Sequence, residues 1–295
     1  MLKSSIRLLS ENGSIKALSP AKINLFLEII GRRRDGYHEI ETIMQCVNLF
    51  DEITIKPAEK GITIKSNCNC LPTDRRNTVY KAISLIKKKT GLKCGVAVTI
   101  KKNIPIGAGL GGGSSNAATT IVAMNRLFNL NLTHKGMDTI AKQIGSDVPF
   151  FLSGSTALCT GRGEKVQPLR FNRKMHYVLL YQNIFMSTKK VYKNVKKCLT
   201  MQKADVNIFS NLLLRGSWQE VGSALFNRLE CPALALNKKL KRAKTMMQKL
   251  GFLGVLMTGS GSGIYGLCKS KKDAVNKAAA LKELTTGDVF ILSSI

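Results

Sequence analysis

The sequence predicts an α+β fold organised as two domains. Its 295 residues exceed a typical single domain of about 150 residues. In the first half, alternating apolar and polar residues predict strands, and apolar residues at helical spacing predict three helices among them. The second half reads as strand, helices, strand, strand, helix, strand, which is the ferredoxin-like order. We place the boundary near residues 165–175, with domains of 1–168 and 169–295.

Four strands are predicted near the N-terminus, at residues 22–30, 40–49, 52–56 and 62–65. Asp35-Gly36 marks the turn between the first two. Residues 57–61 should join the last two as a hairpin, because both segments alternate and a proline and a glycine bound the connection. Residues 1–18 carry no motif.

Three helices and one further strand are predicted before residue 145. The first helix covers residues 77–89 and ends at Gly91. Its apolar face is formed by Val79, Ala82, Ile83 and Ile86. A strand covers residues 96–101, a second helix covers 115–128, and a third runs from the N-cap Thr133 to Ile144.

The pattern changes after Gly145. Short strands with glycine turns are predicted over residues 150–160 and around Val166. The remaining strands are predicted at 176–181, 253–257, 264–268 and 289–293, with several helices over 189–250 and one helix over 271–283.

The charge is strongly positive, with 46 Lys+Arg against 18 Asp+Glu and a net charge of +28. Such a balance is typical of nucleic-acid-binding proteins, and also of enzymes that act on anionic substrates. No apolar run approaches the roughly 18–20 residues that span a bilayer, and no secretory signal is recognisable. The eight cysteines form neither a zinc set nor a disulfide framework. We therefore expect a cytoplasmic protein with reduced thiols.

The strongest local signal is the glycine-rich segment PIGAGLGGGSSNAA, residues 105–118. Five glycines precede a helix, so backbone N–H groups can converge there without interfering side chains. The helix N-terminus adds free donors and the positive end of a dipole. This arrangement predicts an anion cradle suited to a triphosphate. It is neither the P-loop pattern nor the dinucleotide-binding fingerprint.

Four other segments are weak signals when taken singly. MTGSGSG (257–263) is either a hairpin turn or a close approach to a ligand, and Asp147 in GSDVPFF is either a cap or a functional carboxylate. Lys22 in PAKINL is either solvated or buried against an anion. DGYHE (35–39) is either a turn or a group of an aromatic ring, an imidazole and a carboxylate.

Taken in order, these segments resemble the GHMP kinase superfamily of small-molecule kinases, over about residues 19–266. The resemblance implies a two-domain fold, with an N-terminal domain like ribosomal protein S5 domain 2 and a ferredoxin-like C-terminal domain. It also implies ATP-dependent transfer of a phosphoryl group to a hydroxyl. DGYHE followed by ETIMQ (41–45), with the long glycine loop, is similar to members that phosphorylate the 2-hydroxyl of a methylerythritol linked to cytidine diphosphate in isoprenoid synthesis.

The resemblance implies roles for individual residues. Asp147 matches the proposed catalytic base, Lys22 matches the lysine beside it, and Asn24 matches a polar residue near the substrate hydroxyl. Asn77 and Lys102 match positions near adenine, although Asn77 could simply cap a helix and Lys102 could be a solvated strand end. The expected phosphate-binding segment is Pro105, Ile106, Gly107, Ala108, Gly109, Leu110, Gly111, Gly112, Gly113, Ser114 and Ser115.

The resemblance also implies a Mg²⁺ ion with the ATP, for which either Ser114 or Ser115 could be a ligand. The expected substrate-binding residues are Asn24, Tyr37, His38, Thr188, Tyr192, Gly259, Ser260 and Gly261. The expected partner is this small molecule, with no membrane and no specific nucleic acid, and the expected state is a monomer or weak dimer. Three alternatives are another GHMP kinase with a different alcohol, an RNA-binding protein and a non-catalytic GHMP protein. Low aromatic content and the absence of RNP and KH signatures disfavour the RNA-binding protein. The presence of both Lys22 and Asp147 disfavours the non-catalytic protein.

Overall fold

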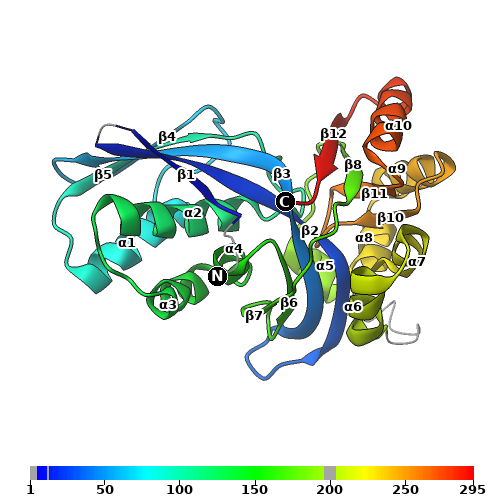
Figure 1. Cartoon of the computed structure of the whole chain (residues 1–295), viewed down its shortest axis with the longest axis horizontal. Helices are drawn as coiled ribbons and strands as arrows, with labels where there is room; N and C mark the ends of the chain where they lie inside the picture. The colour runs from blue at the N-terminus through cyan, green and yellow to red at the C-terminus, as the bar shows by residue number, and fades with distance from the viewer. Residues whose placement is uncertain (1–4, 12, 196–203) are drawn as a thin grey trace.

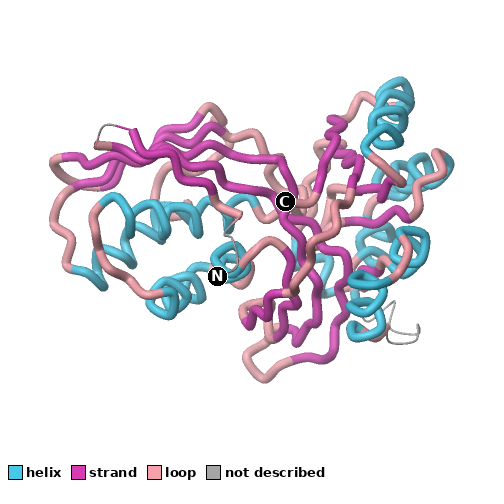
Figure 2. The backbone as a smooth tube through the Cα atoms, viewed as in Figure 1, coloured by secondary structure: helices cyan, strands magenta, loops and turns pink. Residues whose placement is uncertain are grey.

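The computed structural model describes residues 5–11, 13–195 and 204–295. Figure 1 shows two lobes side by side, each a β-sheet with helices packed against it. Helices and strands are mixed along the chain, as the α+β prediction requires (Figure 2). Within these ranges, no helix is long and apolar enough to cross a membrane.

Two long strands form the centre of the larger sheet. β2 (Ser14–Arg32) and β3 (His38–Ala58) pair antiparallel, and three register shifts interrupt their ladder and bend the pair. The sheet order is β1-β2-β3-β5-β4, where the outer strands are β1 (Arg7–Glu11), β4 (Ile62–Ser66) and β5 (Gly95–Lys101). Three short strands extend it, β6 (Thr156–Thr160), β7 (Lys165–Pro168) and β9 (Phe226–Asn227). β1 pairs with the start of β2, so part of the segment without a motif belongs to the sheet.

The predicted hairpin between residues 52–56 and 62–65 is wrong. β4 pairs in parallel with β5, and β5 lies between β4 and β3. The chain leaving β3 crosses the end of β5 at Gly95, whose nitrogen donates to the Glu59 carbonyl. A Cβ at Gly95 would lie 2.5 Å from the carbonyl carbon of Lys60. Because Gly95 has no side chain, the connection can pass over β5 to reach the far edge.

Four helices belong to this lobe, α1 (Thr78–Thr90), α2 (Gly112–Leu127), α3 (His134–Ile144) and α4 (Val148–Ser153). The predicted ends of α1 and α3 are confirmed. The Asn77 side chain accepts a hydrogen bond from the Val79 nitrogen, and Gly91 ends α1 with φ 72°. The Thr133 hydroxyl accepts from the Gly136 nitrogen at the start of α3.

The strand predicted to begin at residue 150 is wrong at its start, because residues 148–153 form α4. Pro149 lies in the first turn of this helix, a position that proline favours. All residues from 148 to 152 are buried, and a short fully apolar run fits a buried helix as well as a buried strand. The strand begins at Thr156 as β6 and pairs with β7.

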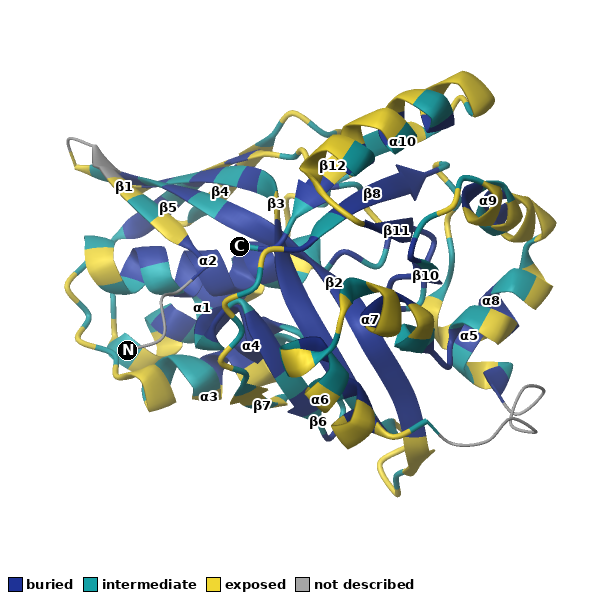
Figure 3. Cartoon of the chain, turned by 45° about the vertical axis from the view of Figure 1, so that its right-hand side comes forward, coloured by how far each residue is buried: buried dark blue, intermediate teal, exposed yellow. Residues whose placement is uncertain are grey.

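The smaller sheet confirms the ferredoxin-like order. Its strands are β8 (His176–Tyr181), β10 (Gly254–Met257), β11 (Ile264–Cys268) and β12 (Asp288–Ser293). They are antiparallel in the order β10-β11-β8-β12. The helices of this half are α5 (Thr188–Lys193), α6 (Val206–Arg215), α7 (Trp218–Ala224), α8 (Glu230–Leu236), α9 (Lys238–Lys249) and α10 (Lys271–Leu284). The outer faces of α9 and α10 are exposed (Figure 3).

β2 lies at the junction of the two halves. α2 packs against it from one lobe, and Tyr265 of β11 donates from its hydroxyl to the Asn24 carbonyl from the other. Residues 19–29 are consequently buried without interruption, which Figure 3 shows as a dark strand. Any polar side chain on this stretch needs a partner inside the protein. We retain the division at residue 168 as a proposal; β9, from beyond it, joins the larger sheet.

The expectation of thiols throughout is wrong for Cys68 and Cys70, and also for Cys231, which is disulfide-bonded. Cys68 and Cys70 form a disulfide in the segment after β4, with Cα atoms 5.4 Å apart. A turn here, in which the Leu71 nitrogen donates to the Cys68 carbonyl, brings the two residues together. In the sequence, Cys68 and Cys70 are the only close pair of cysteines, but we interpreted them as reduced thiols with the others.

Candidate active site

Lys22 is a buried cation on β2, so the alternative of a solvated lysine does not hold. The residue is 3% exposed. Its Nζ donates to Asn24 Oδ1 at 2.6 Å and lies 3.6 Å from Asp147 Oδ2. A fixed ammonium in such surroundings stabilises negative charge that develops beside it, because little water screens the interaction.

Asp147 comes from the segment between α3 and α4. It occupies the N-cap position of α4, but its side chain makes no capping hydrogen bond. The carboxylate instead faces Lys22, and its side chain is 35% exposed. Asp147 is therefore an accessible carboxylate beside a buried cation. This arrangement favours a functional carboxylate over a helix cap.

Two threonines fix the orientation of Asn24. Asn24 Nδ2 donates to Thr42 Oγ1 at 2.8 Å, and the Thr42 hydroxyl donates to the Phe26 carbonyl at 2.6 Å. The backbone nitrogen of Asn24 donates to Thr258 Oγ1 at 3.1 Å. With its amide nitrogen turned towards Thr42, Asn24 presents Oδ1 to Lys22.

The predicted glycine-rich segment forms the turn that leads into α2. Gly107, Gly109 and Gly111 have φ values of 74°, 76° and 68°. Residues with a side chain rarely adopt this left-handed backbone conformation. Gly111 is the N-cap of α2, and no side chain caps this helix. The backbone nitrogen of Lys22 donates to the Leu110 carbonyl at 3.0 Å, and this bond holds the loop directly over Lys22. The open helix end therefore faces the buried cation, as an anion cradle requires.

Residues 258–263, the turn between β10 and β11, interlock with this loop. The Gly263 nitrogen donates to the Ala108 carbonyl at 3.0 Å. A Cβ on Gly109 would overlap the carbonyl oxygen of Thr258, and a Cβ on Gly259 would lie 3.4 Å from Lys22 Nζ. Both glycine loops, one from each half of the chain, thus meet at Lys22.

A second group of residues lies around the start of β3. The rings of His38 and Tyr192 are tilted by 33°, with centroids 5.0 Å apart. The preceding Tyr37 is 55% exposed. Thr188 Oγ1 lies 2.8 Å from Ser260 Oγ, which links α5 to the loop over Lys22. Burial, then the negative charge of Asp147, raises the pKa of Tyr192, so these rings are within electrostatic reach of Asp147.

Arg162 is a cation of the site that the sequence analysis did not single out. It lies in the turn between β6 and β7, and its guanidinium is 4.9 Å from the centre of the Tyr37 ring. The neighbouring Gly163 has no side chain, and a Cβ there would lie 3.8 Å from Asp147 Oδ1. This turn therefore lies between Asp147 and the aromatic group. GRGE (161–164) reads locally as a simple turn, so its signal was easily missed.

Comparison with known proteins identifies the family. A family model described as the N-terminal domain of GHMP kinases matches residues 77–155, and one described as the GHMP kinase C-terminal domain matches residues 209–285. The chain belongs to the GHMP kinase family. A protein of Caldicellulosiruptor saccharolyticus, named 4-diphosphocytidyl-2-C-methyl-D-erythritol kinase, is 40% identical over 263 residues, covering 89% of this chain and 91% of that protein.

Solved structures agree with this family and fold. A crystal structure of 4-(cytidine 5'-diphospho)-2C-methyl-D-erythritol kinase has a TM-score of 0.81 and 34% identity, covering 94% of this chain and 98% of that one. L. major mevalonate kinase, at 18% identity, has a TM-score of 0.74 and covers 100% and 98% of the two chains. The second likeness shows the fold alone. The predicted two-domain GHMP kinase fold is thus confirmed, and the protein is an ATP-dependent kinase.

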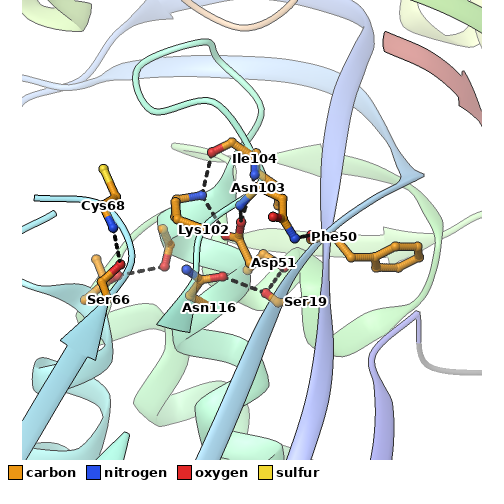
Figure 4. A network of polar contacts seen from close by, with 12 residues as sticks. Ser19, Phe50, Asp51, Ser66, Cys68, Lys102, Asn103, Ile104 and Asn116 are labelled. Carbon is orange, nitrogen blue, oxygen red and sulfur yellow. Dashed lines mark hydrogen bonds and ion pairs between the residues drawn. The ribbon is translucent and has the colours of Figure 1, made fainter. Parts of the chain in front are cut away.

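The two residues expected near adenine in this GHMP kinase both have hydrogen-bond partners within the protein. Asn77 uses Oδ1 to cap α1 and donates from Nδ2 to the Pro72 carbonyl at 2.6 Å, as its alternative role required. Lys102 is not a solvated strand end. Its Nζ donates to Asp51 Oδ2 at 2.6 Å and to the Ile104 carbonyl at 2.7 Å (Figure 4).

Burial lowers the pKa of Lys102, and the neighbouring Asp51 carboxylate acts in the opposite direction. A Cβ on Gly112 would lie 2.9 Å from Lys102 Nζ. The ammonium group therefore lies beneath the first turn of α2. In this GHMP kinase, Lys102 and Asp51 thus form a buried ion pair against the end of the phosphate loop.

Ser114 and Ser115, which the sequence could not separate, have different surroundings. Ser115 is fully buried, and its hydroxyl lies 2.7 Å from that of Ser19. Ser19 in turn donates to Asn116 Oδ1 (Figure 4). Ser114 is partly exposed in the first turn of α2. Of the two hydroxyls, that of Ser114 is the one placed to meet a ligand.

Proposed function

We propose that this GHMP kinase transfers the γ-phosphoryl group of ATP to the 2-hydroxyl of 4-diphosphocytidyl-2-C-methyl-D-erythritol, in the synthesis of isoprenoid precursors. The groups gathered around Asp147 carry the proposal. Lys22 lies 3.6 Å from Asp147, the turn that bears Arg162 lies beside it, and the rings of His38 and Tyr192 contact each other near the same site. The substrate offers an alcohol for Asp147, a diphosphate for Arg162 and a pyrimidine base for the rings. The names of the relatives support the same substrate.

Asp147 would accept the proton of the substrate hydroxyl as that oxygen attacks the γ-phosphorus. Lys22 stands 3.6 Å away, where its charge stabilises the developing negative charge on the attacking oxygen. Asn24 holds the ammonium in place through Oδ1. Phosphoryl transfer depends mainly on positioning and charge stabilisation, and these three residues supply both.

The phosphates of ATP would lie on the glycine loop, residues 105–115, with the dipole of α2 behind them and the Lys102–Asp51 ion pair beneath the helix end. Mg²⁺ fits this site, because it binds through phosphate oxygens, water and only one or two protein oxygens. The described residues indeed contain no cluster of three acidic, His or Cys ligands. The Ser114 hydroxyl would hold the ion, which would neutralise phosphate charge.

The cytosine base would pack against the rings of His38 and Tyr192, with Tyr37 nearby. Burial and the positive charge of Arg32 lower the pKa of His38, so its imidazole is neutral at pH 7. A neutral imidazole offers one donor and one acceptor, which suits the mixed donor and acceptor edge of cytosine. Thr188 and the 259–261 loop would close the site beside the sugar.

The KM for the cytidyl substrate is expected to depend on His38 ionisation. Because the pKa is lowered from about 6.5, KM should be constant above that pH and rise only at more acidic pH, where the protonated imidazole no longer accepts a hydrogen bond. Initial rates between pH 5 and 8 measure this. His38→Gln should remove the acidic rise, whereas the control His176→Gln should retain it. An unchanged acidic rise in His38→Gln would contradict the assignment.

Arg162→Met is expected to raise the KM for the cytidyl substrate about 10- to 100-fold, since a hydrogen bond to a charged group contributes roughly 1.5–3 kcal/mol. Methionine keeps the apolar stem and removes only the charge. The kcat and the KM for ATP should change little, because the predicted contact is with the substrate diphosphate. Arg170→Met, at an exposed arginine shortly after β7, is the control. Equal effects of both variants would argue against the contact.

The proposed substrate is tested by measuring ADP formation from ATP with purified protein, Mg²⁺ and three alcohols in parallel. Turnover is expected with 4-diphosphocytidyl-2-C-methyl-D-erythritol and not with mevalonate or homoserine. Activity on only one of the other alcohols would keep the family activity and overturn the substrate.

A further inference from the structure

Residues 226–230, which we call the clasp, join the strand that carries Lys22 to the glycine loop that covers it. The clasp begins with β9, which pairs in parallel with β2 and places Asn227 opposite Leu27. The backbone nitrogen of Arg228 then donates to the Leu27 carbonyl at 2.8 Å. This short contact brings a segment of the second half of the chain onto the central strand of the first.

On the loop side, the clasp holds the backbone on both sides of Thr258. Asn227 Nδ2 donates to the carbonyls of Met257 and Gly259, at 2.7 and 2.8 Å. Glu230 Oε1 accepts from the Met257 nitrogen at 2.8 Å. Asn227 is buried, so water cannot easily replace its hydrogen bonds, and losing the amide would leave two carbonyl groups without these donors.

On the strand side, a buried ion pair fixes the clasp. Arg228 donates from Nε and one terminal nitrogen to the two carboxylate oxygens of Glu28, at 2.7 and 2.5 Å. Burial alone would raise the pKa of Glu28, but hydrogen bonds from Arg228 and from the nitrogens of Ala204 and Ile29 outweigh it and lower the pKa. The pair is therefore charged at neutral pH, and two charge-assisted hydrogen bonds join its members.

The loop that the clasp holds touches the reacting groups. Thr258 Oγ1 accepts from the Asn24 nitrogen and lies 3.2 Å from the Gly109 carbonyl. A Cβ on Gly259 would be 3.4 Å from both Lys22 Nζ and Asn24 Oδ1. A small displacement of this loop would therefore change the position of Lys22 and of the phosphate loop at the same time.

We propose that Asn227 is a positioning residue for phosphoryl transfer. Its two amide hydrogens keep the 257–259 backbone against Lys22 and Asn24, and the rest of the clasp fixes Asn227 to β2. The inference rests on the proposed phosphoryl transfer at Lys22 and Asp147, but not on the identity of the alcohol. The experiment therefore uses whichever acceptor the unsubstituted protein phosphorylates.

Asn227→Ala is expected to lower kcat about 10- to 100-fold per folded molecule, since a displacement of the order of 1 Å can cost about 100-fold in rate. The KM for ATP should change less than kcat. Asn237→Ala is the matched control, because Asn237 caps α9 in the same half of the chain through one side-chain oxygen. The control should lower the melting temperature and leave kcat unchanged. Equal kcat values in Asn227→Ala and the parent protein would overturn the proposal.

Asn227→Asp gives a readout that a purely structural role would not produce. Above the pKa of the new carboxyl, its charge faces two carbonyl oxygens and cannot donate to them. Once protonated, it can donate one hydrogen bond. The ratio of kcat between this variant and the parent should therefore rise as the pH is lowered from 8 to 6. A ratio that stays flat, with both proteins folded, would count against positioning by donation.

Hydrogen exchange keeps the inference testable even if Asn227→Ala or the cytidyl substrate fails as a probe. Backbone amides of residues 257–263 should exchange faster in Asn227→Asp than in the parent protein, and no faster in Asn237→Ala. Unchanged exchange in Asn227→Asp would show that Asn227 does not hold this loop, whatever the substrate proves to be. Faster exchange with no turnover on any alcohol would instead show that Asn227 holds the loop and would overturn the proposed function.

Discussion

Asp147→Asn is expected to lower kcat about 100- to 10,000-fold, the usual range for loss of a positioned general base. Asparagine keeps the shape of the side chain and cannot accept the hydroxyl proton. It also removes the negative charge that lies 3.6 Å from Lys22 Nζ. The KM for ATP should change little, because the phosphate loop and α2 are untouched. Initial rates of ADP formation over a range of both substrates measure these effects.

Lys22→Met should show a comparable fall in kcat, because it removes the cation beside the same reacting atoms. The control is Asp138→Asn on α3, where the carboxylate pairs with Lys142 one helical turn away. This control should remain folded, since surface ion pairs of this kind contribute little to stability. It should also retain full activity, because Asp138 is not one of the residues that contact Lys22. If Asp147→Asn and Asp138→Asn were equally active, the role of Asp147 as base would be excluded.

Gly109→Ala is expected to have the largest effect on stability. The residue has a φ of 76°, so alanine would be strained by about 1–2 kcal/mol. Its Cβ would in addition overlap the Thr258 carbonyl oxygen, where the two glycine loops interlock. The loops would have to separate above Lys22, so both the unfolding midpoint and turnover should fall sharply.

Gly107→Ala separates strain from steric overlap. Gly107 has nearly the same φ, 74°, but a Cβ there would meet only the side chain of Phe185, at an ordinary contact distance of 3.6 Å. This variant should lose only the strain energy and retain the interlocked loops. Thermal unfolding of both variants, followed with and without ATP, checks the difference. Equal melting temperatures would show that the interlock does not contribute to stability.

Local patterns in the sequence predicted the local parts of the structure. The caps at Asn77 and Thr133 and the glycine-rich turn into α2 each depend on a few consecutive residues, so their chemistry can be read directly. The ferredoxin-like order followed from the succession of strands and helices. The hypothesis that Lys22 and Asp147 meet came from the family resemblance, since neither residue alone favoured a functional role over a structural one.

Contacts between distant residues could not be predicted in this way. Arg228 and Glu28 are 200 residues apart, and Lys102 and Asp51 are 51 residues apart. Neither pair leaves a periodic signal. The pairing of β4 with β5 was also missed, because an alternating strand does not specify its neighbour. Arg162 was missed for a related reason, since its neighbours in the site belong to other elements.

The most direct test of the central claim is identification of the product by phosphorus NMR, after incubation with ATP, Mg²⁺ and 4-diphosphocytidyl-2-C-methyl-D-erythritol. The account predicts a new phosphate monoester on the 2-hydroxyl, one equivalent of ADP, and an intact cytidine diphosphate linkage. Cleavage of that linkage, or ADP formation without the new ester, would contradict transfer to the alcohol at Asp147.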